Sequence, residues 1–217
     1  MIYDFAKRSL DLIGAIVLLV VFSPLMILTA IAIKLTSPGP VFVEKKNWHM
    51  QRMGKHGKIF RLYKFRSMMV SADRLEKTDP KYRSVYLEKR TEGGWKPKND
   101  PRISPVGKII RKYSIDEMPQ LINVLKGEMS IVGPRPYLKE ELTEQQKKFP
   151  GTERYVEEMH SVKPGITGYW QVTGRSNVNF DKRVVMDAYY ARKRSLIFDI
   201  LIILKTPWAM ITAKGAV

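Results

Sequence analysis

Two adjacent carboxylates, Asp116 and Glu117, lie in the stretch "KYSIDEMPQL" (112–121) of a chain whose formal net charge is +17. Ser114 and Glu117 have the spacing of a capping box, in which a serine caps a helix and the side chain of a glutamate three residues later accepts a hydrogen bond from the serine N–H. That assignment places Pro119 at the fifth helical position, where its missing N–H costs an internal hydrogen bond. A helix that begins at Asp116 avoids this cost. The pattern therefore favours a carboxylate at a helix start, either as a plain aspartate cap or as a group that does chemistry.

Three arginines have surroundings that suit the binding of phosphate oxygens. Arg111 precedes Asp116 by five residues, and Arg135 lies between two prolines in "GPRP". A side chain on such a stiff backbone loses little freedom when its guanidinium binds two oxygens. Arg175 ends the glycine-rich segment "VKPGITGYWQVTGR" (162–175), whose backbone N–H groups could cradle phosphate. Each arginine alone is typical of a charged surface, but together with the carboxylates they indicate phosphate chemistry.

The composition excludes several other chemistries. The chain has no cysteine, so a disulfide scaffold, a thiol nucleophile and a cysteine-based zinc site are all excluded. Its three histidines, His49, His56 and His160, lack the spacing of a metal motif. With 38 basic residues against 21 acidic ones, the chain favours a polyanionic partner such as nucleic acid, anionic lipid or a phosphorylated substrate.

One apolar run predicts a membrane segment. The 22 residues from Leu12 to Ile33 carry no charged side chain, which is long enough for a helix to cross a bilayer. A signal peptide is disfavoured by the length and by the lack of a small-residue cleavage site before "KLTSPGP". A buried soluble helix is disfavoured because the run has no polar stripe. The next stretch, 44–74, carries nine basic and two acidic residues, so a membrane and an anion are the expected partners.

The centre of this run holds Ser23 and Pro24, and the proline predicts a bend. Two topologies follow: a kinked helix that spans the bilayer, or a re-entrant hairpin that turns at Ser23–Pro24 and returns. The preference for basic flanks on the cytoplasmic side favours the hairpin, because Lys7, Arg8 and Lys34 flank the run. We therefore predict a re-entrant membrane helical hairpin over 1–36 and a membrane-surface catalytic domain over 37–217.

The remaining chain predicts a mostly helical α/β domain with a small sheet. "KIFRLYKF" (58–65) alternates like a strand, and 76–100 is polar enough for a long surface loop. Helices are expected just after Asp116, over about 137–149 and over about 180–192, with a further apolar stretch at the C-terminal end. Segment 162–175 has too little periodicity to predict regular structure.

Several long stretches resemble one family. "KRSLDLIGAIVLLVVFSPLMILTAIAIKLTSPGPVF", "YKFRSM", "DPRISPVGKIIRKYSIDEMPQLINVLKGEMSIVGPRP" and "PGITGYWQVTGR" are similar to the bacterial sugar transferases, which are monotopic phosphoglycosyl transferases. The resemblance covers nearly the whole chain, and the ending is more similar to the galactose- and glucose-phosphate transferases than to the acetamido-sugar members. It implies a re-entrant membrane helix joined to a compact α/β domain that interfacial amphipathic helices hold on the membrane surface.

The resemblance also implies a reaction. Members of this family move a sugar phosphate from a UDP-sugar to undecaprenyl phosphate, with Mg²⁺, at the cytoplasmic face of the bacterial inner membrane. By resemblance, Asp116 attacks the sugar-bearing phosphorus, UMP leaves, and the lipid phosphate then attacks the aspartyl intermediate. Glu117 is expected to help hold Mg²⁺. A variant without the covalent step, in which Asp116 acts as a base in a ternary complex, stays open.

The resemblance further assigns residues around the phosphates. Lys64, Arg111 and Arg135 match family positions near the phosphates, and Gln171 and Arg175 match its nucleotide-side loop. The expected partners are a UDP-sugar, undecaprenyl phosphate and membrane lipids, with a homodimer left open and no nucleic acid. Two other classes remain as alternatives: a basic membrane-anchored protein that binds nucleic acid or lipid, and a non-catalytic scaffold whose acidic pair only caps a helix.

Overall fold

Helices dominate the computed structural model, which describes residues 2–43, 47–80, 82–83, 100–174 and 178–211. In these residues the strands are four, and each is three residues long: β1 (Gln51–Met53), β2 (Ile59–Arg61), β3 (Ser130–Val132) and β4 (Gly165–Thr167). β1 and β2 pair antiparallel, whereas β3 and β4 pair parallel. The predicted α/β class, mostly helical with little sheet, is confirmed.

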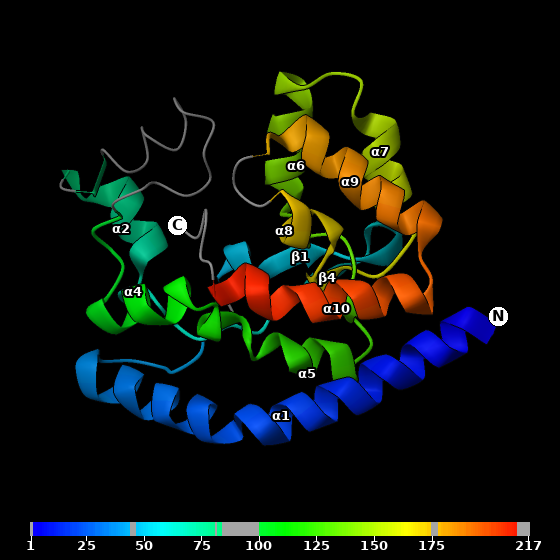
Figure 1. Cartoon of the computed structure of the whole chain (residues 1–217). Coiled ribbons are helices and arrows are strands. Elements are labelled where there is room, and N and C mark those ends of the chain that lie inside the picture. Colours follow the sequence, from blue (N-terminus) through cyan, green and yellow to red (C-terminus); the bar gives the residue numbers. More distant parts are fainter. Residues whose placement is uncertain (1, 44–46, 81, 84–99, 175–177, 212–217) are drawn as a thin grey trace.

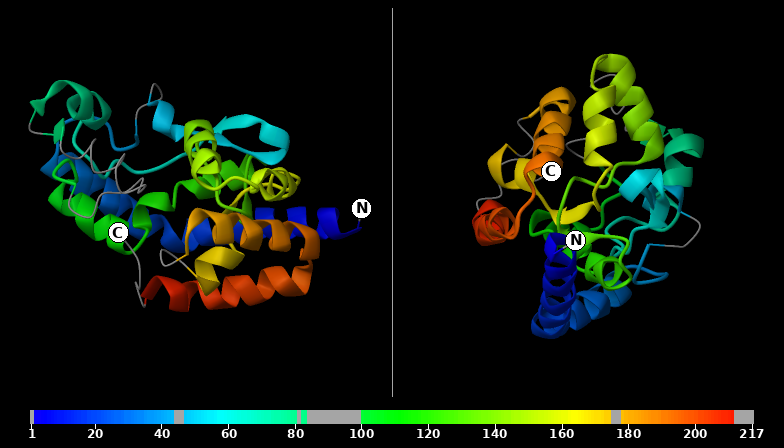
Figure 2. Two further views of the ribbon diagram at one scale, coloured as in Figure 1. Left: turned by 90° about the horizontal axis from the view of Figure 1, so that it is seen from above. Right: turned by 90° about the vertical axis from the view of Figure 1, so that its right-hand side faces the viewer.

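The long N-terminal helix lies along one edge of the domain, and the other helices form layers on one side of it (Figure 1). The helices are α1 (Ile2–Thr36), α2 (Ala72–Thr78), α4 (Pro105–Lys112), α5 (Gln120–Leu125), α6 (Lys139–Lys148), α7 (Glu153–Met159), α8 (Tyr169–Thr173), α9 (Phe180–Lys193) and α10 (Leu196–Ile211). α1 lies along the bottom of the domain in Figure 1, α5 and α10 lie above it, and α6, α7 and α9 lie at the top. Figure 2 shows the same arrangement end-on, with α1 at one edge of the domain.

α1 is one uninterrupted helix of 35 residues, with Pro24 inside it. Figure 1 shows that it bends near its middle instead of folding back on itself. Pro24 has no N–H to donate to the carbonyl four residues earlier, and the Ser23 hydroxyl donates to that same Val20 carbonyl at 2.8 Å. The hydroxyl therefore satisfies the acceptor that the proline leaves free. The hairpin that was predicted to turn at Ser23–Pro24 and return is not formed (Figure 1): the feature there is a bend within one helix.

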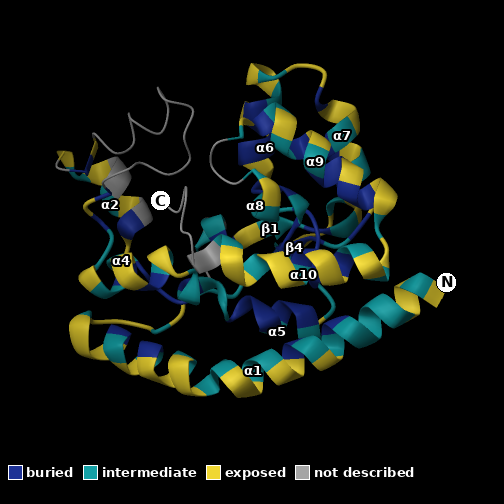
Figure 3. Ribbon diagram, viewed as in Figure 1, coloured by how far each residue is buried: buried dark blue, intermediate teal, exposed yellow. Residues whose placement is uncertain are grey.

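Buried apolar side chains from seven parts of the chain meet in the main core. α5 lies at its centre and is almost wholly buried, as its dark blue ribbon in Figure 3 shows. The cluster comprises Ala15, Phe60, Leu62, Leu121, Val124, Met129, Ile131, Val132, Val162, Tyr190, Ala191 and Ile202. α5 ends before Gly127, whose φ of 78° is the left-handed conformation that glycine adopts at low cost. The core thus fixes α5 and β3, the two elements beside the acidic pair and the "GPRP" arginine.

A polar contact ties α1 to β3 within this core. Asp11, which is 2% exposed, accepts hydrogen bonds from the Ser130 hydroxyl and the Ile131 N–H, both at 2.9 Å. Lys7 lies 3.3 Å from Asp11 and 3.2 Å from Asp199 of α10. Because β3 leads directly into the loop that carries Arg135, α1 helps to position that loop.

Three sequence expectations need correction. The strand expected over 58–65 is confined to 59–61. The expected loop over 76–100 begins as helix, since α2 runs to Thr78, and it ends at the buried Asp100; residues 84–99 lie outside the described part. Segment 162–175, for which no regular structure was predicted, contains β4 and α8. Glycine at position 165 lets the backbones of β4 and the segment after β3 approach closely, because a Cβ on Gly165 would lie 2.0 Å from the Gly133 nitrogen.

Candidate active site

The acidic pair lies in a short 3-10 turn, Ile115–Glu117, between α4 and α5. Ser114 has a φ of 55° and makes no side-chain cap, so the capping box is absent, as predicted. The predicted helix start at Asp116 is wrong, however, because α5 begins only at Gln120 with Pro119 as its N-cap. A rigid proline therefore separates the turn from the helix, where its missing N–H costs no hydrogen bond.

Lys64 links the two carboxylates. Its Nζ lies 2.8 Å from Oδ2 of Asp116 and 3.2 Å from Oε1 of Glu117. Asp116 is 2% exposed, and its backbone carbonyl accepts a hydrogen bond of 2.9 Å from the N–H of Phe65. Burial opposes the charge of Lys64, but the carboxylates of Asp116 and Glu117 raise its pKa above the usual value. The site therefore holds a partly buried ammonium shared between one buried and one partly exposed carboxylate.

Arg111 approaches the same carboxylates from α4. The helix is capped by Ser104, whose hydroxyl accepts from the Gly107 N–H at 2.9 Å, and it begins with Pro105. Arg111 lies in its last turn and donates from Nε to the Ser67 hydroxyl at 2.8 Å. Burial lowers the pKa of Arg111, and the nearby charge of Asp116 opposes that shift.

Arg135 approaches from the loop after β3. Its backbone N–H donates to Oδ2 of Asp187 at 3.2 Å, and its guanidinium lies 3.9 Å from Glu141 and 5.5 Å from the centre of the Tyr137 ring. Burial opposes the charge of Arg135, but Glu141, Tyr137 and Glu117 together raise its pKa. Arg135 is therefore close enough to Glu117 for that carboxylate to raise its pKa, while its role at the donor phosphates stays a prediction.

The other predicted site residues are placed differently. Gln171, on α8, donates from Nε2 to the Ile166 carbonyl at 3.2 Å, and no described contact joins it to the acidic pair. Its buried Oε1 has no hydrogen-bond partner among the described residues. Arg175 lies outside the described residues. Ser23 and Pro24 form the bend in α1 and have no described contact with the carboxylates.

Two ionisable residues of the site were not predicted. Arg52 of β1 is close enough to Arg135 for burial and this like charge to lower its pKa to about 10, while Glu141 and Glu117 act in the opposite direction. Asp187 of α9 is fully buried beneath Arg135. Arg52 is one of nine basic residues in its stretch, and Asp187 occurs in an ordinary helical sequence. Spacing alone therefore gave no signal that singled out either residue.

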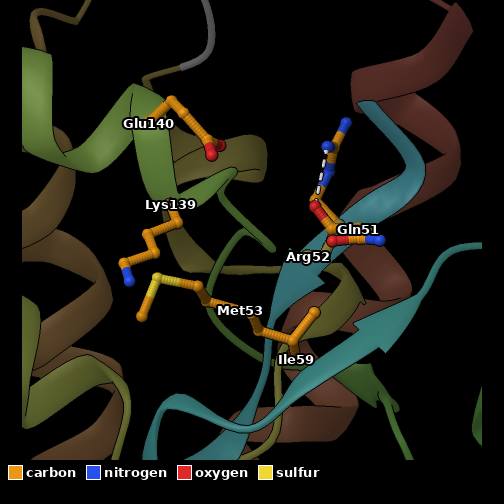
Figure 4. A pocket seen from close by; sticks show the side chains of 6 residues that line it. All are labelled: Gln51, Arg52, Met53, Ile59, Lys139 and Glu140. Atoms are coloured by element: carbon orange, nitrogen blue, oxygen red, sulfur yellow. Dashed lines mark hydrogen bonds between the residues drawn. The ribbon is translucent and has the colours of Figure 1, made fainter. Parts of the chain in front are cut away.

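A pocket lined in part by Arg52 borders this region. It is lined by Gln51, Arg52, Met53, Ile59, Lys139 and Glu140. Figure 4 shows that its walls come from the β1–β2 hairpin on one side and the start of α6 on the other. Neither carboxylate of the acidic pair lines it, so this pocket is not where the acidic pair would react.

The donor set of the site suits a magnesium ion that is completed by a substrate. Within the described parts of the chain, no group of three or more aspartate, glutamate, histidine or cysteine residues could enclose a metal. Mg²⁺ is usually bound through one or two carboxylates together with substrate phosphates and water. The partly exposed Glu117 carboxylate, adjacent to Asp116, meets that requirement.

Comparison with known proteins gives a consistent result. A family model described as bacterial sugar transferase matches residues 2–213. The chain is 42% identical over 219 residues to an undecaprenyl-phosphate galactose phosphotransferase of Salmonella typhimurium, covering 98% of this chain and 42% of that protein. It is 38% identical over 215 residues to the exopolysaccharide production protein ExoY of Sinorhizobium fredii, covering 97% of this chain and 88% of that protein.

A third relative acts on a different sugar according to its name. This UDP-N-acetylgalactosamine-undecaprenyl-phosphate N-acetylgalactosaminephosphotransferase of Aeromonas hydrophila is 37% identical over 218 residues, covering 99% of this chain and 46% of its own length. The chain therefore spans less than half of the Salmonella and Aeromonas proteins but most of ExoY.

Proposed function

Because the chain belongs to the bacterial sugar transferase family, we propose that it transfers a sugar-1-phosphate from a UDP-sugar to undecaprenyl phosphate and releases UMP. The sugar is a hexose such as galactose or glucose, and the product begins the assembly of a surface polysaccharide or another glycan. Names of relatives support the lipid acceptor, and they include both galactose and N-acetylgalactosamine as the sugar. The observation that carries the proposal is the buried Asp116 carboxylate, held 2.8 Å from Lys64 and next to Glu117.

The proposed chemistry has two displacements at one phosphorus atom. In the first, an Asp116 carboxylate oxygen bonds to the sugar-bearing phosphorus, and the bond to the bridging oxygen breaks so that UMP leaves with that electron pair. In the second, a phosphate oxygen of undecaprenyl phosphate bonds to the same phosphorus and displaces Asp116. A carboxylate needs no general base to attack, and two easier steps replace one difficult step.

The surrounding cations suit this chemistry. Lys64, Arg111 and Arg135 approach the acidic pair from three different parts of the fold and would offset the charge of the donor phosphates. Glu117 would help to hold Mg²⁺, which when bound would offset the charge of the phosphates.

Contacts at both ends of α1 support a re-entrant placement in the membrane. α1 is long and apolar enough to cross a bilayer by length and composition. Near its start, Arg8 donates to the carbonyls of Val124 and Leu125 at 2.6 and 2.9 Å, and near its end Ile33 is buried against Phe65 and Ile110. A spanning helix has its ends on opposite sides of the membrane, whereas both ends of α1 contact the same domain.

The exposed faces of α1 and α10 complete the proposed membrane surface. α1 exposes apolar side chains mainly three or four residues apart: Ile13, Ile16, Val17, Val20, Val21, Leu25, Ile27, Leu28, Ile31 and Leu35. α10 exposes Ile197, Ile200, Leu201, Leu204 and Trp208. These faces suit insertion into one leaflet. We place residues 1–36 in the cytoplasmic face of the inner membrane and residues 37–217 on it.

The test is the release of UMP from a panel of UDP-sugars by the protein in detergent or nanodiscs. With the correct donor and no lipid acceptor, we expect about one UMP per active site, ping-pong kinetics and a mass increase of one sugar phosphate. Asp116→Asn should abolish all three signals and still fold, whereas Glu117→Gln should weaken metal-dependent turnover. Release of UMP only when both substrates are present, without a trapped adduct, would support the ternary-complex reaction. No release from any donor would reject the transferase.

A further inference from the structure

The loop that carries Arg135 offers one backbone donor between its two prolines. Pro134 and Pro136 have no N–H, so the N–H of Arg135 is the donor of this triplet. This N–H donates to Oδ2 of Asp187 at 3.2 Å. Asp187 lies on α9, 52 positions later in the chain. The loop is held on either side by the Gly165 N–H, which donates to the Pro134 carbonyl at 2.8 Å, and by the Met53 N–H, which donates to the Tyr137 carbonyl at 2.9 Å.

Asp187 is an unusual residue for its position. It is 0% exposed, on a helix face that buries Val184, Ala188 and Ala191 beside it. A buried acid is costly unless its oxygens are well paired, and Oδ1 of Asp187 has no hydrogen-bond partner among the described residues. Packing alone would favour an apolar side chain here.

The charged and titratable groups around Asp187 belong to the same loop and to its own helix. Arg135 and Tyr137 face it from the loop after β3, and Arg183 lies one turn earlier on α9. Burial raises the pKa of Asp187 to about 8, while the N–H of Arg135 and the charges of Arg183 and Arg135 act in the opposite direction. The Tyr137 hydroxyl is also buried without a hydrogen-bond partner in the described part of the chain. The polar group that pairs best with Asp187 is therefore the N–H of Arg135.

We propose that Asp187 is a positioning residue: by accepting the Arg135 N–H, it fixes the loop so that the guanidinium stays beside Glu141 and in place for the phosphates of the donor. This inference rests on the proposed function, because the value of a fixed guanidinium is the binding of phosphate oxygens. Asp187 itself touches no substrate. A shift of about 1 Å in a positioned group can reduce turnover by about a hundredfold, so one hydrogen bond to this loop is enough to matter.

Two substitutions separate this role from simple packing. Asp187→Ala removes the acceptor and should reduce UMP release about ten- to hundredfold. Asp187→Asn keeps an oxygen that can accept the N–H, so it should remain within about threefold of the wild type. If Asp187→Ala fails to fold, Asp187→Ser takes its place, because its hydroxyl is too short to reach the Arg135 N–H. Thermal melting of each variant checks that it is folded.

A double-mutant cycle supplies the decisive readout. In a protein that already carries Arg135→Ala, removing the Asp187 acceptor should lower UMP release by less than about threefold, because nothing is left to position. Asp100→Asn is the control: Asp100 is also buried, at 5% exposed, but it pairs with Arg102 and has no described contact with the Arg135 loop, so its effect should be the same with or without Arg135.

The outcomes are distinct. If the losses from Asp187→Ala and Arg135→Ala multiply, or if Asp187→Ala stays within threefold of the wild type, Asp187 does not position Arg135. Equal loss in the Asn and Ala variants would likewise overturn the inference, since the acceptor oxygen would then be irrelevant. Failure of the wild-type protein itself to release UMP would refute the proposed function, a different result that needs no variant.

Discussion

Replacement of Lys64 by methionine removes the ammonium that lies between Asp116 and Glu117, and it keeps a side chain of similar length. At separations of 2.8 and 3.2 Å, the two attractions are each about 5–6 kcal/mol before desolvation, with an effective dielectric constant of about 20. The cost of burying the ammonium offsets much of this. Removal of one partner from a buried ion pair destabilises a protein by about 3–5 kcal/mol, because a buried charge is left uncompensated. We expect a loss of that size.

A second substitution tests the source of the loss. Asp116 is 2% exposed, so most of the penalty should come from its unpaired charge. Lys64→Met combined with Asp116→Asn should therefore be more stable than Lys64→Met alone, by about 2 kcal/mol or more. Asp116→Asn alone should cost about 1–2 kcal/mol, since Lys64 still contacts Glu117 at 3.2 Å.

The assay is thermal unfolding in detergent, followed by circular dichroism. For a chain of this length, each kcal/mol corresponds to about 2–4 °C, so Lys64→Met should melt about 6–20 °C below the wild type. Lys108→Met makes the same charge change at an exposed position of α4 and should shift the melting temperature by about 2 °C at most. If Lys64→Met melts like Lys108→Met, or if Asp116→Asn destabilises it further, Lys64 is not the counter-charge of a buried aspartate.

Three further predictions concern Arg135, α1 and Asp187. Arg135→Lys should impair UMP release despite keeping the charge, because an ammonium cannot bind two oxygens as a guanidinium does; wild-type kinetics would make Arg135 an ordinary surface charge. A cysteine introduced at Ile2 should resist an impermeant label added from the periplasmic side, and Pro24→Ala should increase labelling by favouring a straight, spanning helix; labelling in the parent would refute the re-entrant placement. Since the raised pKa of Asp187 makes the folded protein bind a proton that the unfolded chain releases, this residue should lower stability as pH rises from about 4 to about 8. Asp187→Asn should remove that part of the pH dependence in denaturation midpoints, and parallel curves for the two proteins would contradict the assignment.

Local patterns in the sequence determined much of the architecture. The charge-free run from Leu12 to Ile33 predicted the long apolar helix, because an uninterrupted apolar surface of that length is readable without any tertiary contact. The helices near 139–148 and 180–193 followed from helical patterning, and Pro119 correctly excluded a cap by Ser114. The acidic pair and the arginines of the site were singled out by neighbouring residues and by the family motifs.

The tertiary structure decided the pairing of the short strands and the form of the bend in α1. Strands of three residues are too short to show alternation, so β3 and β4 became visible only through their pairing, which Gly133 and Gly165 permit by close backbone contact. The form of the bend at Pro24 depended on whether a nearby hydroxyl could satisfy the Val20 carbonyl, which is a matter of geometry.

The same division holds in the site. The sequence named Asp116 and Arg135, but their partners Lys64 and Asp187 lie about fifty residues away along the chain. Resemblance to a family suggested Lys64, whereas no motif identified Asp187 or Arg52. Residues so distant in sequence carry no shared periodicity, and only the packing of α9 and of the β1–β2 hairpin against the Arg135 loop brings these side chains together.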